Sequence, residues 1–255
     1  VEFQYADFSF AAMTMICQYA ATHHARNYGP LPIVFRMPSG WVKSAGPFHS
    51  LNPESQFASV PGLKIVAPVT AHDAKGLLIA AMRDKNPVLF LEYKGWYRNK
   101  PDSLPPELNC PVPEEDYVVP IGTARILKTG SDLTLISYGS QVFRALEAAH
   151  AVEQESVGVS IEVIDLRSLV PWDQELVFAS IKKTGKVVVT CEAPEQGCFG
   201  ATIVARLQKC FKYLDAPIML VAAANTSVPF APTLEEAHLP TAEKVAAAIR
   251  ELLAF

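Results

Sequence analysis

The chain has 255 residues, of which half are apolar and 19% are charged, with 22 Lys and Arg against 26 Asp and Glu. This length is sufficient for two domains of ordinary size. The charge balance lacks the basic surplus of nucleic-acid-binding proteins, so we expect no nucleic-acid partner. No apolar run reaches the length that spans a bilayer, and we therefore expect no membrane segment.

Short apolar runs rich in β-branched residues alternate with helical patterns along most of the chain. In chain order we predict a helix over 8–23, a strand over 31–36, a helix over 53–59, a strand over 63–67, a helix over 71–84, strands over 88–92 and 133–138, a helix over 141–155, a strand over 160–165, a helix over 173–183, a strand over 186–191, a helix over 199–211, a strand over 218–221 and a helix over 242–253. Continuous apolar strands of this kind are typical of parallel sheets that are buried on both faces. The alternation predicts an α/β fold with two doubly wound domains and mainly parallel sheets.

Three helix starts carry recognisable capping residues. Thr70 followed by Asp73 resembles a capping box, and Thr241 is suited to cap the last helix. Asn52 before Pro53 predicts an N-cap followed by the first helical residue.

The segment Asn99–Pro120 interrupts the strand and helix alternation. It contains six prolines and the acidic run Glu114–Asp116. This composition is typical of an extended linker. We therefore predict one domain with its linker over 1–118 and a second domain over 119–255.

Five cysteines are scattered along the chain without metal-ligand spacing: Cys17, Cys110, Cys191, Cys198 and Cys210. An odd number without a pattern favours reduced thiols in a reducing compartment, packed as small hydrophobic residues. The sequence Gly197–Gly200 opens a predicted helix. It could offer amides to an anion, although a simple tight helix entry is the interpretation we favour.

The loop Gly46–Glu54 contains the strongest local candidate for catalysis, His49. It lies just before a predicted helix, where the helix dipole favours a neutral imidazole. An imidazole can donate and accept a proton at physiological pH, which suits general acid or base work. An ordinary surface histidine is the alternative that the local pattern leaves open.

Ten segments spread along the chain, in matching order, carry a resemblance to a known family. They are Phe3–Phe8, Pro32–Arg36, Phe48–Ser50, Pro61–Val66, Asp73–Leu77, Arg83–Pro87, Val163–Arg167, Pro171–Asp173, Lys183–Gly185 and Leu214–Pro217. The chain resembles the beta subunit of the thiamine-diphosphate-dependent decarboxylating component of 2-oxo acid dehydrogenase complexes, within the transketolase-like superfamily.

The resemblance implies a pyrimidine-binding domain followed by a transketolase C-terminal domain. It implies an α2β2 assembly in which an alpha subunit binds Mg²⁺ and the diphosphate of thiamine diphosphate, with a lipoyl-bearing acyltransferase core as a further partner. The implied location is the mitochondrial matrix or the bacterial cytoplasm. The chain starts at Val1 without an initiator Met, in what reads as a strand, so we expect the first domain to lack its N-terminal part.

Two site residues follow from the resemblance. Phe8 aligns with the aromatic residue that packs on the aminopyrimidine, although a core aromatic is the alternative reading. His49 aligns with the active-site histidine that assists acyl transfer to the lipoyl group. Ser50 could orient the histidine ring or cap the following turn, and we favour the cap.

The family's glutamate that promotes the imino tautomer of the cofactor lies upstream of the matched segments. Glu2 is the nearest acidic residue, but it does not fit that motif. We therefore expect this polypeptide to be unable to decarboxylate, even with an alpha subunit.

The resemblance also implies a potassium site formed by carbonyl and side-chain oxygens. Its residues would be Leu31, Ile33, Val34, Ala81, Asp84 and Asn86. Oxygen ligands suit a hard cation, although Asp84 and Asn86 are equally suited to form a plain turn. Separately, Glu192, Glu195, Glu235 and Glu236 could form an acidic surface for a basic domain of the acyltransferase.

The function that we predict is oxidative decarboxylation of a 2-oxo acid with acyl transfer to a lipoyl group. Tyr97-Arg98 and Asp165-Leu166-Arg167 favour branched-chain substrates over pyruvate, while Pro32–Arg36 leans towards pyruvate enzymes. Two alternatives stay open: the C-terminal part of a transketolase or deoxyxylulose-phosphate synthase, and a catalytically incomplete assembly subunit.

Overall fold

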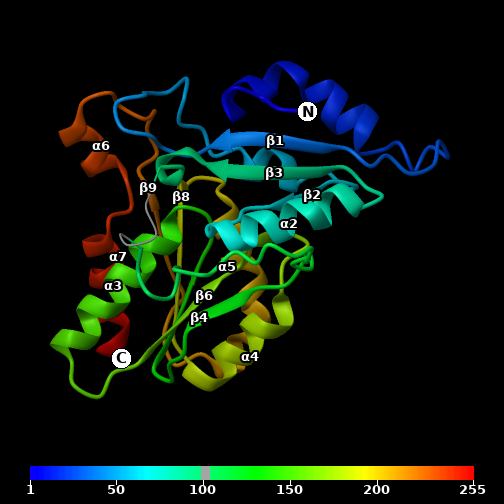
Figure 1. Cartoon of the computed structure of the whole chain (residues 1–255). Coiled ribbons are helices and arrows are strands. Elements are labelled where there is room, and N and C mark those ends of the chain that lie inside the picture. The colour runs from blue at the N-terminus through cyan, green and yellow to red at the C-terminus, as the bar shows by residue number, and fades with distance from the viewer. Residues whose placement is uncertain (99–103) are drawn as a thin grey trace.

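A computed structural model describes residues 1–98 and 104–255, and it contains two sheets, the first in the upper part of the view in Figure 1 and the second below it. The first sheet has the order β1 (Val34–Ser39), β3 (Val88–Tyr93), β2 (Lys64–Val66) and β7 (Ser168–Val170). The first three strands are parallel, and β7 runs antiparallel to β2. The fourth strand therefore comes from the C-terminal half of the chain.

The second sheet is built entirely from the C-terminal half. Its order is β4 (Arg125–Lys128), β6 (Ile161–Asp165), β5 (Leu133–Ser137), β8 (Val187–Pro194) and β9 (Met219–Ala223). All pairs are parallel except β4 with β6. The expected two-sheet, mainly parallel α/β architecture is confirmed.

Helical segments connect these strands. They are η1 (Ala6–Ala12), η2 (Thr14–Ala20), α1 (Glu54–Ala58), α2 (Ala71–Arg83), η3 (Lys94–Trp96), α3 (Gln141–Glu155), α4 (Gln174–Thr184), α5 (Phe199–Leu207), η5 (Gln208–Tyr213), α6 (Pro232–His238) and α7 (Ala242–Leu253). None of the helices in the described ranges is long and apolar enough to cross a lipid bilayer.

The predicted caps at two helices are confirmed, because Thr70 and Thr241 each accept a hydrogen bond from the backbone three residues later. The predicted cap at Asn52 is wrong. Helix α1 begins at Glu54 with Pro53 at the N-cap and no side-chain cap. The Asn52 side chain instead donates to Glu192 across the domain boundary, and this tertiary contact removes it from the helix end.

The first helix also differs from the prediction. Residues 8–23 were expected to form one α-helix, but η1 is a 3-10 helix and η2 a π-helix. Two strands, β4 and β7, and helix α6 have no counterpart among the predicted elements. The predicted linker begins at residues 99–103, which lie outside the described part of the chain, and from Leu104 it continues as turns without strands.

The two halves share one apolar core. Helices α3 and α7 cover one face of the second sheet, whereas α4 and α5 cover the other. On the α5 side, Ile164, Val189 and Ile203 belong to the same buried cluster as Met37 and Tyr93, which lie toward the carboxyl ends of β1 and β3. The carboxyl ends of β1 and β3 are thereby held against the C-terminal domain.

Candidate active site

His49 and Phe8 lie together at the carboxyl end of the first sheet. Their ring centroids are 6.0 Å apart with the planes at 78°, an edge-to-face arrangement. Tyr5 makes a second edge-to-face contact with His49, at 5.3 Å. The structure therefore brings together two residues that are 41 positions apart in the sequence (49 minus 8).

The Phe8 ring is 47% exposed, so it is not a core aromatic. His49 is partly buried, and within the described ranges no side-chain hydrogen bond occupies its imidazole. Because α1 has only five residues, the expected influence of its dipole on His49 is weaker than that of a full helix. The exposed Phe8 ring and the partly buried His49 imidazole therefore lie side by side at this end of the sheet.

Asp7 ties the Phe8 segment to the His49 loop. Its Oδ1 accepts a hydrogen bond from the backbone N–H of Leu51 at 3.1 Å. Its other oxygen, Oδ2, is buried and has no partner among the described residues. The sequence analysis missed Asp7, although its place directly before Phe8 is a signal that could have identified it.

Lys94, at the end of β3, is a second residue that the sequence analysis missed. Its Nζ donates to the carbonyls of Gly40 at 2.9 Å and Pro38 at 3.3 Å, and it lies 5.0 Å from the Tyr5 ring centroid. Burial lowers the pKa of Lys94 to about 8, although the charges of Asp7 and Glu192 oppose this shift. The ammonium therefore fixes the end of β1 beside the aromatic pair.

Ser50 does not cap the following turn. It is 2% exposed, and its Oγ has no hydrogen-bond partner among the described residues.

The expectation of a tight helix entry at Gly197–Gly200 is confirmed, since Cys198 caps α5 with its Sγ 3.4 Å from the N–H of Ala201. The hydrogen bond with Cys191 lowers the pKa of the Cys198 thiol to about 7, while burial opposes it. All five cysteines are free.

The proposed acidic surface is wrong for half of its members. Glu192 and Glu235 are only 9% and 2% exposed, and both accept hydrogen bonds from the His49 loop. Glu195 and Glu236 do lie on the surface. Burial between the domains, rather than solvent, is the environment of the first two.

The predicted potassium ligands lie on two neighbouring segments, Leu31–Val34 and Ala81–Asn86, and most of them already accept hydrogen bonds. The carbonyls that accept backbone hydrogen bonds are those of Leu31, Ile33, Val34 and Ala81. The Asp84 carboxylate accepts from Asn86 at 2.9 Å and forms an ion pair with Lys64. The donor set of oxygens suits a hard cation, yet an ion would have to displace the Lys64 ammonium from Asp84.

Family models match both halves of the chain. The pyrimidine-binding domain of transketolase matches residues 1–100, and the C-terminal domain of transketolase matches residues 122–245. Solved structures with this fold include a split-gene transketolase described as an inactive beta4 tetramer, with a TM-score of 0.75, 23% identity and coverage of 98% of this chain and 74% of that one. A transketolase mutant from Pichia stipitis has a TM-score of 0.68 at 14% identity, over 100% of this chain and 34% of that one. The fold is that of the transketolase-like proteins.

Curated relatives indicate to which class of transketolase-like proteins this chain is similar. The 2-oxoisovalerate dehydrogenase subunit beta of Bacillus subtilis is 41% identical over 258 residues, covering 100% of this chain and 76% of the relative. A mitochondrial counterpart from Arabidopsis thaliana, subunit beta 2, is 39% identical over 260 residues, with 100% and 69% covered. The pyruvate dehydrogenase E1 component subunit beta of Rhizobium meliloti is 41% identical over 254 residues, with 98% and 53% covered. The chain belongs to the family of beta subunits of the 2-oxo acid dehydrogenases.

Proposed function

We propose that this protein is the beta half of a thiamine-diphosphate-dependent 2-oxo acid dehydrogenase, with branched-chain substrates preferred over pyruvate. The observation that carries the proposal is the contact of the exposed Phe8 ring with the partly buried His49, with rings 6.0 Å apart. The Phe8 ring fits a flat heterocycle, and the His49 imidazole beside it has no side-chain hydrogen bond among the described residues. The division into domains over 1–118 and 119–255 belongs to the same proposal.

The cofactor supplies an electron sink that stabilises the carbanion left by decarboxylation. In this proposal Phe8 orients the aminopyrimidine by contact with its face. His49 would act as a general acid or base during acyl transfer to the lipoyl group. An alpha subunit supplies the ligands of Mg²⁺ and the diphosphate, and a lipoyl-bearing acyltransferase receives the acyl group. The compartment would be a bacterial cytoplasm or a mitochondrial matrix.

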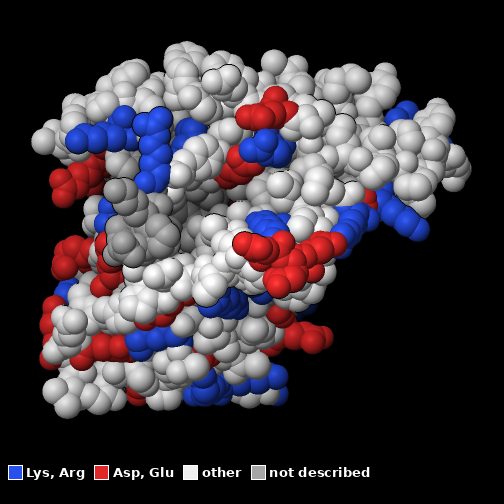
Figure 2. Space-filling view, viewed as in Figure 1, with Lys and Arg blue, Asp and Glu red and all other residues white. Residues whose placement is uncertain are grey.

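An uncharged surface beside this pair supports a subunit contact. Figure 2 shows few charged side chains over the N-terminal segment that contains η1 and η2. Exposed there are Phe8, Phe10, Met15 and Tyr19, at 47%, 42%, 59% and 53%. Apolar and aromatic side chains gathered in this way are typical of protein interfaces.

The test uses the 255-residue chain assembled with its alpha subunit and, beside it, a version extended at the N-terminus to include the family's glutamate. We expect decarboxylation only in the extended version, and the variants below are made in it. Decarboxylation is followed with an artificial electron acceptor, and acyl transfer is followed on an isolated lipoyl domain. We expect His49→Asn to reduce acyl transfer more than decarboxylation. Turnover of sugar phosphates would favour the transketolase alternative, whereas assembly without binding of thiamine diphosphate would favour the assembly subunit.

A potassium ion at the turn formed by Asp84 and Asn86 is a separate proposal. If the ion binds, the melting temperature should be higher in potassium than in sodium salts, and Asp84→Ala should remove the difference. Equal melting temperatures in both salts would leave the residues as a hydrogen-bonded turn with an ion pair to Lys64.

A further inference from the structure

The loop that carries His49 is held by carboxylates from the opposite domain. It runs from Gly40 to Pro53 and has no regular secondary structure. Glu192, on β8, accepts from the backbone N–H of Trp41 at 2.5 Å and from the Asn52 side chain at 3.3 Å, with the same Oε1 atom. One oxygen therefore binds both ends of the loop.

Glu235, on α6, holds the same loop at two further points. Its Oε1 accepts from the indole Nε1 of Trp41 at 2.9 Å and from the backbone N–H of Ser44 at 2.7 Å. Ser44 has a φ of 57°, in the left-handed region that is uncommon for residues other than glycine. A bonded N–H at this residue offsets the cost of that conformation.

Two glycines allow the loop to approach the C-terminal domain this closely. A Cβ atom on Gly40 would lie 2.8 Å from Glu192 Oε1, and one on Gly46 would lie 2.2 Å from the Phe230 ring. Both have positive φ angles, 78° and 65°. The contact thus depends on backbone positions where any side chain would push the loop away.

Burial makes each carboxylate a strong constraint. An ionised carboxylate away from water is costly unless donors surround it, and charge-assisted bonds are the stronger ones. Glu192 also accepts from Ser140 Oγ at the start of α3. Burial raises the pKa of Glu192, and its hydrogen bonds and the charge of Lys94 oppose that shift. The donors that satisfy Glu235 among the described residues come from the His49 loop.

We propose that Glu192 and Glu235 are positioning residues that fix the Gly40–Pro53 loop, so that His49 stays against Tyr5 and Phe8. The proposal rests on the proposed function for its catalytic consequence. It assigns a role to the C-terminal domain, which contributes neither of the two aromatic site residues. Asp7 holds the same loop independently, because its carboxylate accepts a hydrogen bond from the backbone N–H of Leu51.

The experiment compares Glu235→Ala with Glu236→Ala, an exposed neighbour on the same helix, in the full-length protein assembled with its alpha subunit. Hydrogen exchange by mass spectrometry reports the loop directly. We expect faster exchange over residues 41–52 in Glu235→Ala only, with exchange elsewhere close to that of the native protein. Glu192→Ala is tested in the same way. If it does not fold, Glu192→Gln keeps one acceptor oxygen and replaces it as the milder variant, with Glu195→Gln as the control.

The kinetic readout separates positioning from general stability. We expect kcat for acyl transfer to fall by about 10²-fold in Glu235→Ala, since small displacements of a catalytic group have effects of this size, with KM nearly unchanged. Glu235→Gln should recover part of the loss. Unchanged loop exchange, or a kcat equal to that of Glu236→Ala, would overturn the proposal. Faster loop exchange in a protein without 2-oxo acid dehydrogenase activity would instead reject the proposed function and leave the positioning contact standing.

Discussion

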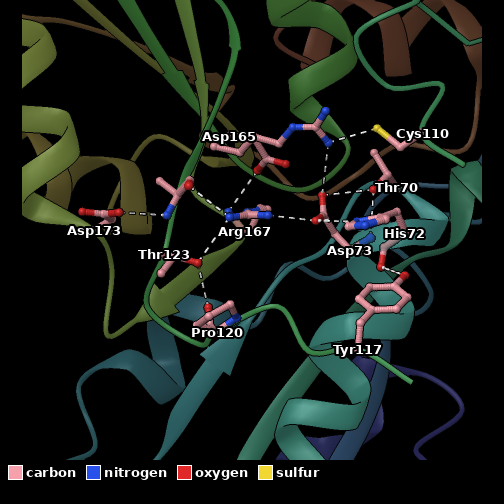
Figure 3. A network of polar contacts seen from close by, with 12 residues as sticks. Thr70, His72, Asp73, Cys110, Tyr117, Pro120, Thr123, Asp165, Arg167 and Asp173 are labelled. Atoms are coloured by element: carbon pink, nitrogen blue, oxygen red, sulfur yellow. Dashed lines mark hydrogen bonds and ion pairs between the residues drawn. The ribbon is translucent and has the colours of Figure 1, made fainter. Parts of the chain in front are cut away.

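Arg167 donates from Nη1 to the Asp73 carboxylate at 2.9 Å, and this ion pair joins the turn after β6 to the first turn of α2. The side chains are only 11% and 1% exposed. Figure 3 shows Arg167 between Asp165, Asp73 and Thr123, and its Nη2 donates to the Thr123 hydroxyl and the Ala124 carbonyl. Residues from both halves of the chain therefore meet at one buried guanidinium.

We predict that Arg167→Met destabilises the protein by about 1–3 kcal/mol, because the buried Asp73 would lose its nearest cation and keep only Arg125, at 3.9 Å, and the Thr70 hydroxyl. Urea unfolding measures the effect. Arg83→Met is the matched control, since the pair of Arg83 with Asp116 is 59% and 62% exposed. Its loss should be below about 1 kcal/mol. Equal losses in the two variants would contradict the importance of burial here.

Glu54 should make stability depend on pH. It is fully buried with Oε1 bound by Tyr138 at 2.8 Å, and burial raises the pKa of Glu54 to about 7. The pKa of an exposed Glu is about 4.3. At pH values between about 4.3 and 7, the folded state therefore holds a proton that the unfolded chain has lost. The stabilisation is present below the lower value and is lost as the pH rises towards 7.

Glu54→Gln removes this titration while keeping an acceptor for Tyr138. For each unit by which the pH rises within this window, the native protein should lose about 1.4 kcal/mol of unfolding free energy relative to the variant. Urea titrations at several pH values between 5 and 6.5 provide the measurement. A difference that does not change with pH would refute the prediction.

Phe8→Ala should weaken binding of thiamine diphosphate to the assembled protein by about tenfold, through loss of an aromatic contact. Phe10→Ala is the control, because Phe10 is similarly exposed, at 42%, and has no ring contact with His49 among the described pairs. Titration calorimetry gives both affinities. The assignment of Phe8 fails if the two variants bind the cofactor alike.

Cys198→Ala should cost about 1 kcal/mol in unfolding free energy, because α5 loses the acceptor at its N-cap. Cys198→Ser should recover this loss, since a hydroxyl oxygen is a better cap than sulfur. Thermal or urea unfolding measures the unfolding free energies of the two variants. A loss of the same size in both would indicate a packing role for the sulfur atom.

The local sequence pattern predicted most strands and several helix ends, because both are set by short-range physics. The predicted bounds of α3 and α7 are those observed, and Thr70 and Thr241 cap as their positions indicate. The pairing of Phe8 with His49 came from the family resemblance and not from spacing. No local signal relates residues that far apart until the chain has folded.

The sequence by itself determined the α/β class, the family and the aromatic and imidazole groups of the site, since these depend on local periodicity and on residue identity. Only the tertiary structure decided that β7 completes the first sheet, that Asn52 leaves its helix end, and that Glu192 and Glu235 are buried. An ionised carboxylate is stable in a protein interior only where hydrogen-bond donors replace the water around it. Those donors come from a loop about 150 to 190 residues away in the chain, so their arrangement exists only after the two domains have packed.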